Sequence, residues 1–229
     1  MAKRKNQSTQ DDELLVDLAG TQESAQDFIE KNQTYLFYGL LAIVLLAGGY
    51  FAYKYLVLAP KQEEAVAQMF KAQEQFERDS FKLALTEPGG NFPGFVQIAD
   101  DYSGTKAGNT ANYYAGVSYL QLGNYEAAIA YLSDFSASGD VMPIMKNGAL
   151  GDAHAESGDL AKAMSFYQKA VSAGDNEILT AYYLKKVGML NEKNGNKSAA
   201  NAAYSQIREN YPNSPEAGDI DKYIFRTKG

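Results

Sequence analysis

Hydrophobic and polar residues follow two different patterns on either side of residue 59. Residues 35–53 form an uninterrupted run of uncharged, mostly apolar residues. After residue 59, apolar residues recur instead at intervals of three and four, as in Ala65, Met69, Ala72 and Phe76. The first pattern is typical of a helix surrounded by lipid, and the second of amphipathic helices that bury one face in a core.

The run at residues 35–53 is long enough to cross a bilayer. Its 19 residues would span about 28 Å as a helix, close to the ~30 Å hydrocarbon core of a membrane. Aromatic residues gather at both ends, as in the belts found at membrane–water interfaces: Tyr35, Phe37 and Tyr38 at one end, and Tyr50, Phe51, Tyr53 and Tyr55 at the other. A cleaved signal peptide and a buried core helix are the alternatives, but the 34 residues before the run favour an uncleaved anchor over 34–58.

Basic residues predict the orientation of this anchor. Residues 1–33 carry four basic residues, three of them within positions 3–5, together with seven acidic ones. Their composition predicts a largely disordered tail. Only Lys54 and Lys61 flank the far end of the run, so the positive-inside rule places the tail in the cytoplasm. In a bacterium with two membranes, the chain would be a single-pass inner-membrane protein with residues 59–229 in the periplasm.

Three segments between residues 111 and 207 resemble one another. Each has a turn glycine, and these glycines are 35 and 37 residues apart. Relative to the turn, a glycine lies seven residues before, an alanine five residues after, and a large residue nine residues after. The four sets are Gly123, Gly158 and Gly195; Gly116, Gly151 and Gly188; Ala128, Ala163 and Ala200; Leu132, Tyr167 and Tyr204. Small residues let two helices approach closely, and the turn glycine supplies the positive φ that ends the first helix. We expect the large residue to fill the gap between successive units.

This pattern resembles the tetratricopeptide repeat, a helix–turn–helix unit of ~34 residues. Repeats are expected near 110–140, 145–175 and 180–212, preceded by a divergent pair, Pro60–Leu85 and Phe92–Tyr102, and followed by a cap at 215–226. Where the family pattern has tryptophan, this chain has Asn112, Asn147 and Leu184, whereas Tyr211 to Pro215 resembles the closing proline of the unit. The predicted fold is all-α: one N-terminal transmembrane helix, then a right-handed α-solenoid, with about nine helices after residue 59.

Several kinds of chemistry are disfavoured. The net charge of −7 argues against a nucleic-acid groove, and the absence of cysteine excludes disulfides and thiolate zinc sites. The chain contains no P-loop, G-x-S-x-G or H-E-x-x-H motif. The single histidine, His154, is expected to be a packed or partly exposed ring, and nothing suggests a pocket around Asp100 and Asp101. We therefore expect no enzyme, no cofactor and no metal.

A binding surface is the remaining possibility. The first helices of stacked repeats line a concave groove. By position in the repeat, the candidate groove residues are Tyr113, Val117, Leu120, Gln121, Met145, Asp152, Glu156, Tyr182, Lys185, Met189 and Glu192. Apolar rings and methionines mixed with charges suit an extended or helical peptide. A clamp for a free carboxyl terminus would need several converging lysines and asparagines, of which only Lys185 qualifies. The alternative is that many of these residues pack against neighbouring helices.

A short tail, one anchor and a periplasmic domain of three to four repeats together resemble the ancillary subunit of the Sec translocon. The similarity extends to a Bacteroidetes-type run at residues 95–129, FVQIADDYSGTKAGNTANYYAGVSYLQLGNYEAAI. The resemblance implies an adaptor whose partners are translocon subunits, emerging secreted chains or periplasmic chaperones. A structural scaffold of an envelope assembly or secretion complex is the alternative, and self-association through the solenoid is a third possibility.

Overall fold

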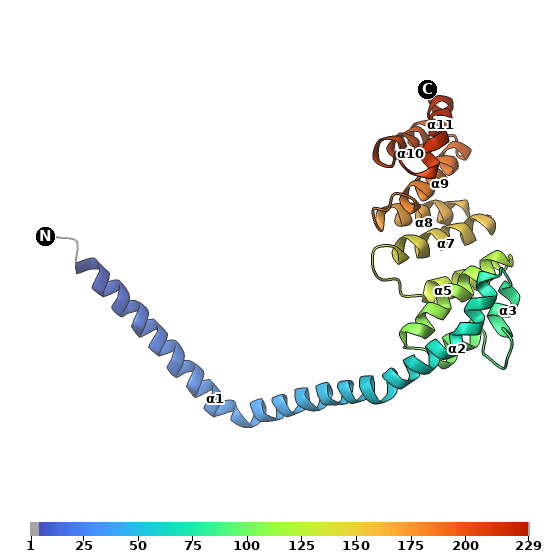
Figure 1. The fold of residues 1–229 in the computed structure, drawn as a ribbon. Helices are drawn as coiled ribbons and strands as arrows, with labels where there is room; N and C mark the ends of the chain where they lie inside the picture. Colours follow the sequence, from blue (N-terminus) through green and yellow to red (C-terminus); the bar gives the residue numbers. More distant parts are fainter. Residues whose placement is uncertain (1–4, 229) are drawn as a thin grey trace. The chain divides into compact units, whose positions relative to one another are not determined.

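A computed structural model describes the backbone of residues 5–228 and the side chains of residues 28–228. Every regular element in the described backbone is helical (Figure 1). The chain forms two compact units, of which the first ends at Val57 and the second begins at Leu58. The predicted all-α class is therefore confirmed.

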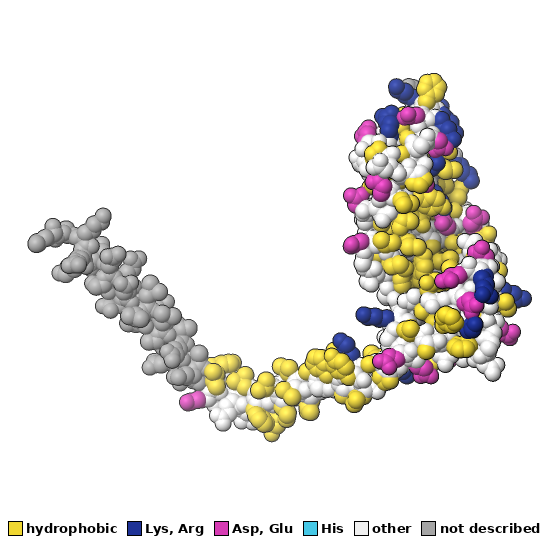
Figure 2. All heavy atoms as spheres, in the orientation of Figure 1, with side chains coloured by type: hydrophobic (Ala, Val, Ile, Leu, Met, Phe, Trp, Pro, Cys, Tyr) yellow, Lys and Arg dark blue, Asp and Glu magenta, His cyan; other side chains and the backbone are white. Residues whose placement is uncertain are grey.

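The first unit is dominated by a single helix, α1 (Lys5–Tyr53). Along the described part of α1 the apolar side chains are exposed, and Figure 2 shows groups of them along the helix. Exposed apolar area on this scale is unfavourable in water and is expected in lipid. By length and composition this helix could cross a membrane, although an N-terminal signal sequence meets the same criteria.

Helix α1 also begins earlier than the sequence predicts. Disorder is predicted for most of residues 1–33, yet the backbone is helical from Lys5 onward. The segment has no proline and contains many residues that favour helix, such as Ala, Glu, Gln and Leu. Residues 1–4 of the predicted tail lie outside the described residues.

After η1, a five-residue π-helix (Lys54–Leu58), the second unit begins with α2 (Ala59–Glu77), α3 (Phe81–Thr86) and α4 (Phe95–Asp101). The prediction of one helix over Pro60–Leu85 is wrong. Asp79 adopts a φ of +55°, which a right-handed helix does not allow, so the chain breaks there and restarts as α3. This break raises the number of α-helices in the described part of the second unit from about nine to ten.

The second helix of this divergent pair is shorter than predicted. Helix α4 begins at Phe95 rather than Phe92 because Pro93 and Gly94 form the end of the preceding loop. Gly94 lies so close to the backbone of Leu85 that a side chain at this position would overlap it. Glycine is therefore required where the loop passes the end of α3.

Three helix pairs and a cap complete the second unit. The pairs are α5 (Lys106–Gln121) with α6 (Tyr125–Asp134), α7 (Met142–Glu156) with α8 (Leu160–Ser172), and α9 (Leu179–Lys193) with α10 (Lys197–Asn210). The cap consists of η2 (Pro215–Asp219), a 3₁₀-helix, and α11 (Ile220–Thr227). The stack of pairs is visible in Figure 1.

The three turns inside the pairs share one construction. Each turn glycine has a positive φ, of 75°, 89° and 77° in chain order, as the sequence predicts. The next residue then caps the second helix, because its side-chain oxygen accepts the backbone N–H three residues later. These caps are Asn124, Asp159 and Asn196.

The large residue of each unit lies over the glycine of its own pair. A Cβ atom added at Gly151 would lie 2.5 Å from the ring of Tyr167, and the same relation joins Leu132 to Gly116 and Tyr204 to Gly188. The prediction that this residue fills the gap between successive units is thus only part of its role. Tyr167 and Tyr204 also contact the following unit, since their rings lie near those of Tyr183 and Tyr223, at 6.0 and 5.2 Å.

The first helices of successive pairs contact one another, α5 with α7 and α7 with α9. Among the described residues, no comparable contact joins α6 to α8 or α8 to α10. Helices α5, α7 and α9 therefore lie side by side and form one face of the stack, which we call the first-helix face.

Candidate functional site

The predicted groove residues all lie on α5, α7 or α9, the helices of the first-helix face. On α5, Tyr113, Val117 and Leu120 are half-buried, and Gln121 at the end of the helix is exposed. The ring of Tyr113 lies 5.2 Å from that of Phe135, and burial raises the pKa of its hydroxyl to about 12. Tyr113 therefore contributes to packing as much as to a surface.

Apolar exposure is greater on α9. Tyr182 is 40% exposed and Met189 is 50% exposed, while Met145 on α7 is half-buried. Tyr182 stands at the start of α9 and Met189 near its middle, two turns apart. These side chains are available for contact with another molecule.

Asp152 has a different role, because it connects two repeats. Its Oδ1 accepts a hydrogen bond from the Tyr167 hydroxyl at 2.7 Å and forms an ion pair with Lys186 of α9. The Lys186 ammonium also lies 5.4 Å from the ring centre of Tyr167 and 4.7 Å from that of Tyr182. Burial acts to lower the pKa of Lys186, but the hydrogen bond to Asp152, the charge of Asp152 and the neighbouring Tyr182 hydroxyl together outweigh it, and the pKa is raised. Lys186 is therefore charged and held in place.

Glu192 repeats this arrangement between the last repeat and the cap. It accepts a hydrogen bond from the Tyr204 hydroxyl at 2.7 Å and two from the Arg226 guanidinium, at 2.8 and 2.6 Å. The bond from Arg226 lowers the pKa of Glu192. Bidentate pairs of this kind are the stronger class of ion pair. Of the predicted groove residues, Asp152 and Glu192 thus serve mainly to join repeats.

Lys185 is also engaged within the chain. Its ammonium pairs with Asp219 of η2 at 3.0 Å and lies 5.1 Å from the ring centre of Tyr223. Glu156, at the end of α7, is exposed. The structure therefore leaves two apolar side chains of this face, Tyr182 and Met189, more accessible than most of its predicted charges.

Sequence reasoning missed Lys186, Arg226 and Asp219, which complete these ion pairs. One signal was available, because tyrosine occupies the large-residue position in the second and third repeats. A buried tyrosine hydroxyl needs a hydrogen-bond partner, and a carboxylate on the paired helix is the natural acceptor. The cation that balances this carboxylate comes from the next unit, so its identity depended on how the repeats stack.

The Asp152 pair makes a stability prediction. Asp152→Ala leaves Lys186 and the Tyr167 hydroxyl half-buried without their acceptor, so we expect the free energy of unfolding to fall by about 1–3 kcal/mol. The double variant Asp152→Ala/Lys186→Met should lose about 1 kcal/mol less free energy of unfolding than the sum of the losses of the two single variants. Urea unfolding of the single and double variants measures the cycle, and strictly additive losses would contradict it.

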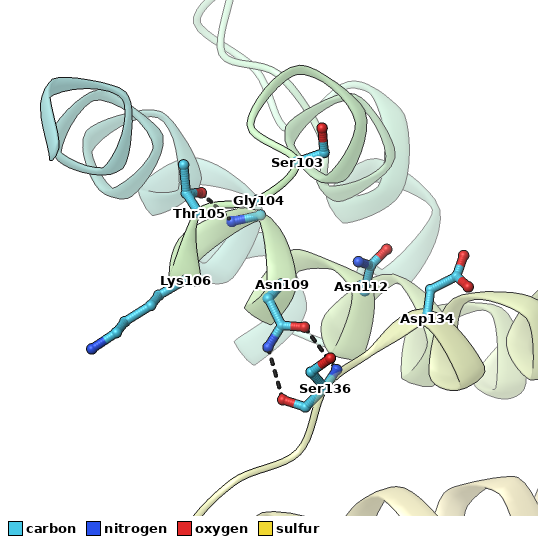
Figure 3. Close-up of a pocket in the computed structure, with 9 residues that line it drawn as sticks. Ser103, Gly104, Thr105, Lys106, Asn109, Asn112, Asp134 and Ser136 are labelled. Atoms are coloured by element: carbon cyan, nitrogen blue, oxygen red, sulfur yellow. Dashed lines mark hydrogen bonds between the residues drawn. The ribbon is translucent and has the colours of Figure 1, made fainter. Parts of the chain in front are cut away.

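A polar pocket lies beside the start of α5 (Figure 3), with a volume of about 420 Å³. Its lining comprises Ser103, Gly104, Thr105, Lys106, Gly108, Asn109, Asn112, Asp134 and Ser136. The Asn109 side chain accepts the backbone N–H of Ser136 at 2.7 Å and donates to its carbonyl oxygen at 3.0 Å. These two hydrogen bonds hold the chain where it leaves α6. Within residues 28–228, no group of His, Cys, Asp and Glu is arranged to hold a metal.

His154 is a packed ring in the second repeat. It is 7% exposed and stacks on Phe166, with ring centres 5.2 Å apart. Burial lowers the pKa of His154, and the charge of Lys162 adds to this effect while that of Asp159 opposes it. The folded protein therefore disfavours the protonated ring.

This shift predicts a pH dependence of stability. Below about pH 6.5, the unfolded chain takes up a proton at His154 before the folded chain does. The free energy of unfolding should consequently fall as the pH decreases from 6.5. Above that pH, His154 is neutral in both states and should cause no further change in stability. His154→Phe keeps the ring stack and should flatten the dependence between pH 7 and 5.5. Urea midpoints of both proteins across this range provide the test, and parallel pH profiles would contradict it.

Comparison with known families supports the repeat assignment. Three segments, residues 97–140, 147–173 and 186–214, each match a family described as tetratricopeptide repeat. They fall mainly on the pairs α5–α6, α7–α8 and α9–α10. No curated protein matches the chain significantly. Domains of this family are typically non-catalytic and imply protein partners. The chain is a tetratricopeptide-repeat protein with a long apolar N-terminal helix.

Proposed function

We propose that this protein is a membrane-anchored adaptor that binds other polypeptides on the first-helix face of its repeats. The exposed apolar side chains of α9, Tyr182 and Met189, are the observation that carries this proposal. Exposed apolar groups are typical of protein-binding surfaces, and this face belongs to a repeat family that implies protein partners.

The anchor in this proposal is the apolar part of α1. Residues 35–53 would contact the bilayer, within an anchor over 34–58, and the basic residues of positions 3–5 would keep the N-terminus in the cytoplasm. The repeats would then lie in the periplasm of a bacterium with two membranes. A reporter that is active only in the periplasm, fused after Gly229, should be active. Activity of a cytoplasm-only reporter at the same site would overturn this topology.

The partners in this proposal are proteins of the export pathway. Its support is the resemblance of the tail, anchor and repeats to the ancillary Sec translocon subunit, together with the apolar first-helix face. Unfolded chains leaving a translocon expose apolar segments, which such a face could bind. Translocon subunits and periplasmic chaperones are the other expected partners.

Site-specific crosslinking in intact cells tests this proposal. A photoreactive residue at Tyr182 or Met189 should capture translocon subunits and nascent secreted chains. The matched control is Phe225 on α11, which is 81% exposed and lies on the cap. Capture of a single fixed envelope protein would instead support the scaffold alternative, and identical products from all three positions would contradict a role for the first-helix face.

A further inference from the structure

Apolar side chains occupy the same repeat positions at the starts of α7 and α9. Val141 and Ile178, 37 residues apart in the sequence, immediately precede these helices and are 40% and 57% exposed. One helical turn later come Met145 and Tyr182, whose backbone N–H groups bond to the carbonyls of Val141 and Ile178. Residues joined in this way lie on one face of a helix. We call these four side chains the mouth patch.

The two halves of the mouth patch belong to helices in direct contact. The ring of Tyr183, the neighbour of Tyr182, occupies the space over Gly148 of α7. The loop before α9 also rests on the start of α7, because an added Cβ at Gly174 would lie 2.8 Å from the carbonyl oxygen of Asp140. The starts of α7 and α9 are therefore close together.

Carboxylates precede both halves of the mouth patch. Asp140 is adjacent to Val141, and Asp175 and Glu177 lie just before Ile178. Asp175 and Glu177 accept hydrogen bonds from the Tyr211 hydroxyl and from the backbone N–H of Asn213. Both donors are neutral, so neither of them offsets the negative charge of its carboxylate partner.

The nearby lysines on α7 and α9 are held by other groups. Lys146 donates to the carbonyl oxygens of Ser133 and Phe135, and Lys186 pairs with Asp152. Helix N-termini carry only about +0.5 charge each, so two of them do not balance three carboxylates. The charges immediately next to the mouth patch in the sequence, Asp140, Asp175 and Glu177, are thus acidic.

We propose that the mouth patch binds a short apolar segment of a polypeptide that carries lysine or arginine beside it. This inference rests on the proposed function and names the chemistry of the bound segment. Apolar side chains would pack on Val141, Met145, Ile178 and Tyr182, and the flanking cations would reach the carboxylates of Asp140, Asp175 and Glu177. Charge complementarity of this kind selects partners and accelerates association.

The test uses the full-length protein in nanodiscs of uncharged lipid and three fluorescent peptides, with anisotropy as the readout. One peptide has a leucine and valine core flanked by lysines, one has the same core flanked by glutamates, and one has a serine and glycine core flanked by lysines. Empty nanodiscs correct for binding to lipid. We expect the first peptide to bind roughly tenfold or more tightly than the other two, and to weaken as salt is raised.

Substitutions then locate the site. Ile178→Ser should weaken the first peptide about fivefold to tenfold, as expected for an apolar anchor. Combining Asp140→Lys with Glu177→Lys should remove the preference for lysine flanks over glutamate flanks. Phe225→Ser, which removes an exposed ring on the cap, is the matched control and should leave binding unchanged. Far-UV circular dichroism of each variant verifies that the helices are retained.

The outcomes separate this inference from the proposed function. Equal affinity for lysine-flanked and glutamate-flanked peptides would overturn the charge preference. Unchanged binding by a folded Ile178→Ser variant would overturn the site while leaving peptide binding intact. Failure of all three peptides to bind would overturn the inference, whereas the crosslinking experiment from Met189, outside the mouth patch, decides the adaptor function independently.

Discussion

Replacing Phe95 with alanine is expected to lower the free energy of unfolding by about 3–5 kcal/mol. Phe95 is completely buried at the start of α4, and its ring stacks on that of Tyr114 with centres 4.9 Å apart. The ring of Phe76 lies 6.1 Å away. The substitution removes these contacts and leaves a cavity between α2, α4 and α5 that rigid helices cannot close. Urea unfolding of the fragment 58–229, followed by circular dichroism, measures the loss.

The same experiment shows whether the divergent first pair belongs to the repeat core. Phe225→Ala removes an equally large ring that is exposed on α11, so its effect should stay within about 0.5 kcal/mol. A loss below about 1 kcal/mol for Phe95→Ala would contradict the packing described here. It would mean that α2 to α4 contribute little to the stability of the stack.

Gly188→Ala should destabilise the third repeat by about 3 kcal/mol, because the new methyl group would overlap the ring of Tyr204. Tyr204 is fully buried and its hydroxyl is bonded to Glu192, so the ring has little freedom to move away. Either the ring leaves its site or α9 and α10 separate. Urea unfolding and hydrogen exchange of the amides in α9 and α10 detect both outcomes.

A second substitution tests the cause of this loss. Leu132 stands over Gly116 as Tyr204 stands over Gly188, and a methyl added at Gly116 would lie 2.6 Å from the Leu132 Cγ, so only a side chain smaller than leucine would relieve the overlap. Gly188→Ala combined with Tyr204→Ala should therefore be less destabilised than the sum of the two single variants. Gly218→Ala, in η2 with no atom within 4 Å of the added methyl, is the control and should have little effect. Full additivity would indicate that the overlap with Tyr204 is not the cause.

The parts of the fold that the sequence predicted are those that depend on local spacing. Gly123, Gly158 and Gly195 were recognised as turns because glycine readily adopts a positive φ, and the described backbone has it at all three. The break at Asp79 was missed because a non-glycine residue with positive φ has only a weak sequence signal. The helical backbone of residues 5–33 was missed because composition describes an average tendency and not the conformation of each residue.

The candidate site was predictable only as a surface. Repeat position placed Tyr182 and Met189 on the first-helix face, and both are exposed there. The same reasoning selected Asp152 and Glu192, which instead join neighbouring units through Lys186 and Arg226. Position within a repeat states which face a residue occupies. It does not state which residues of the next unit will reach it.

By itself the sequence determined the two parts of this protein: an apolar run long enough to cross a membrane and a series of paired helices. Both follow from short-range periodicity, because a helix repeats every 3.6 residues and its neighbours are set by spacing. Only the tertiary structure decided which charges are used internally and which apolar side chains stay exposed. The ion pairs of Asp152 and Glu192 each join residues 34 positions apart in the sequence. They depend on the stacking of one repeat on the next, which no local pattern specifies.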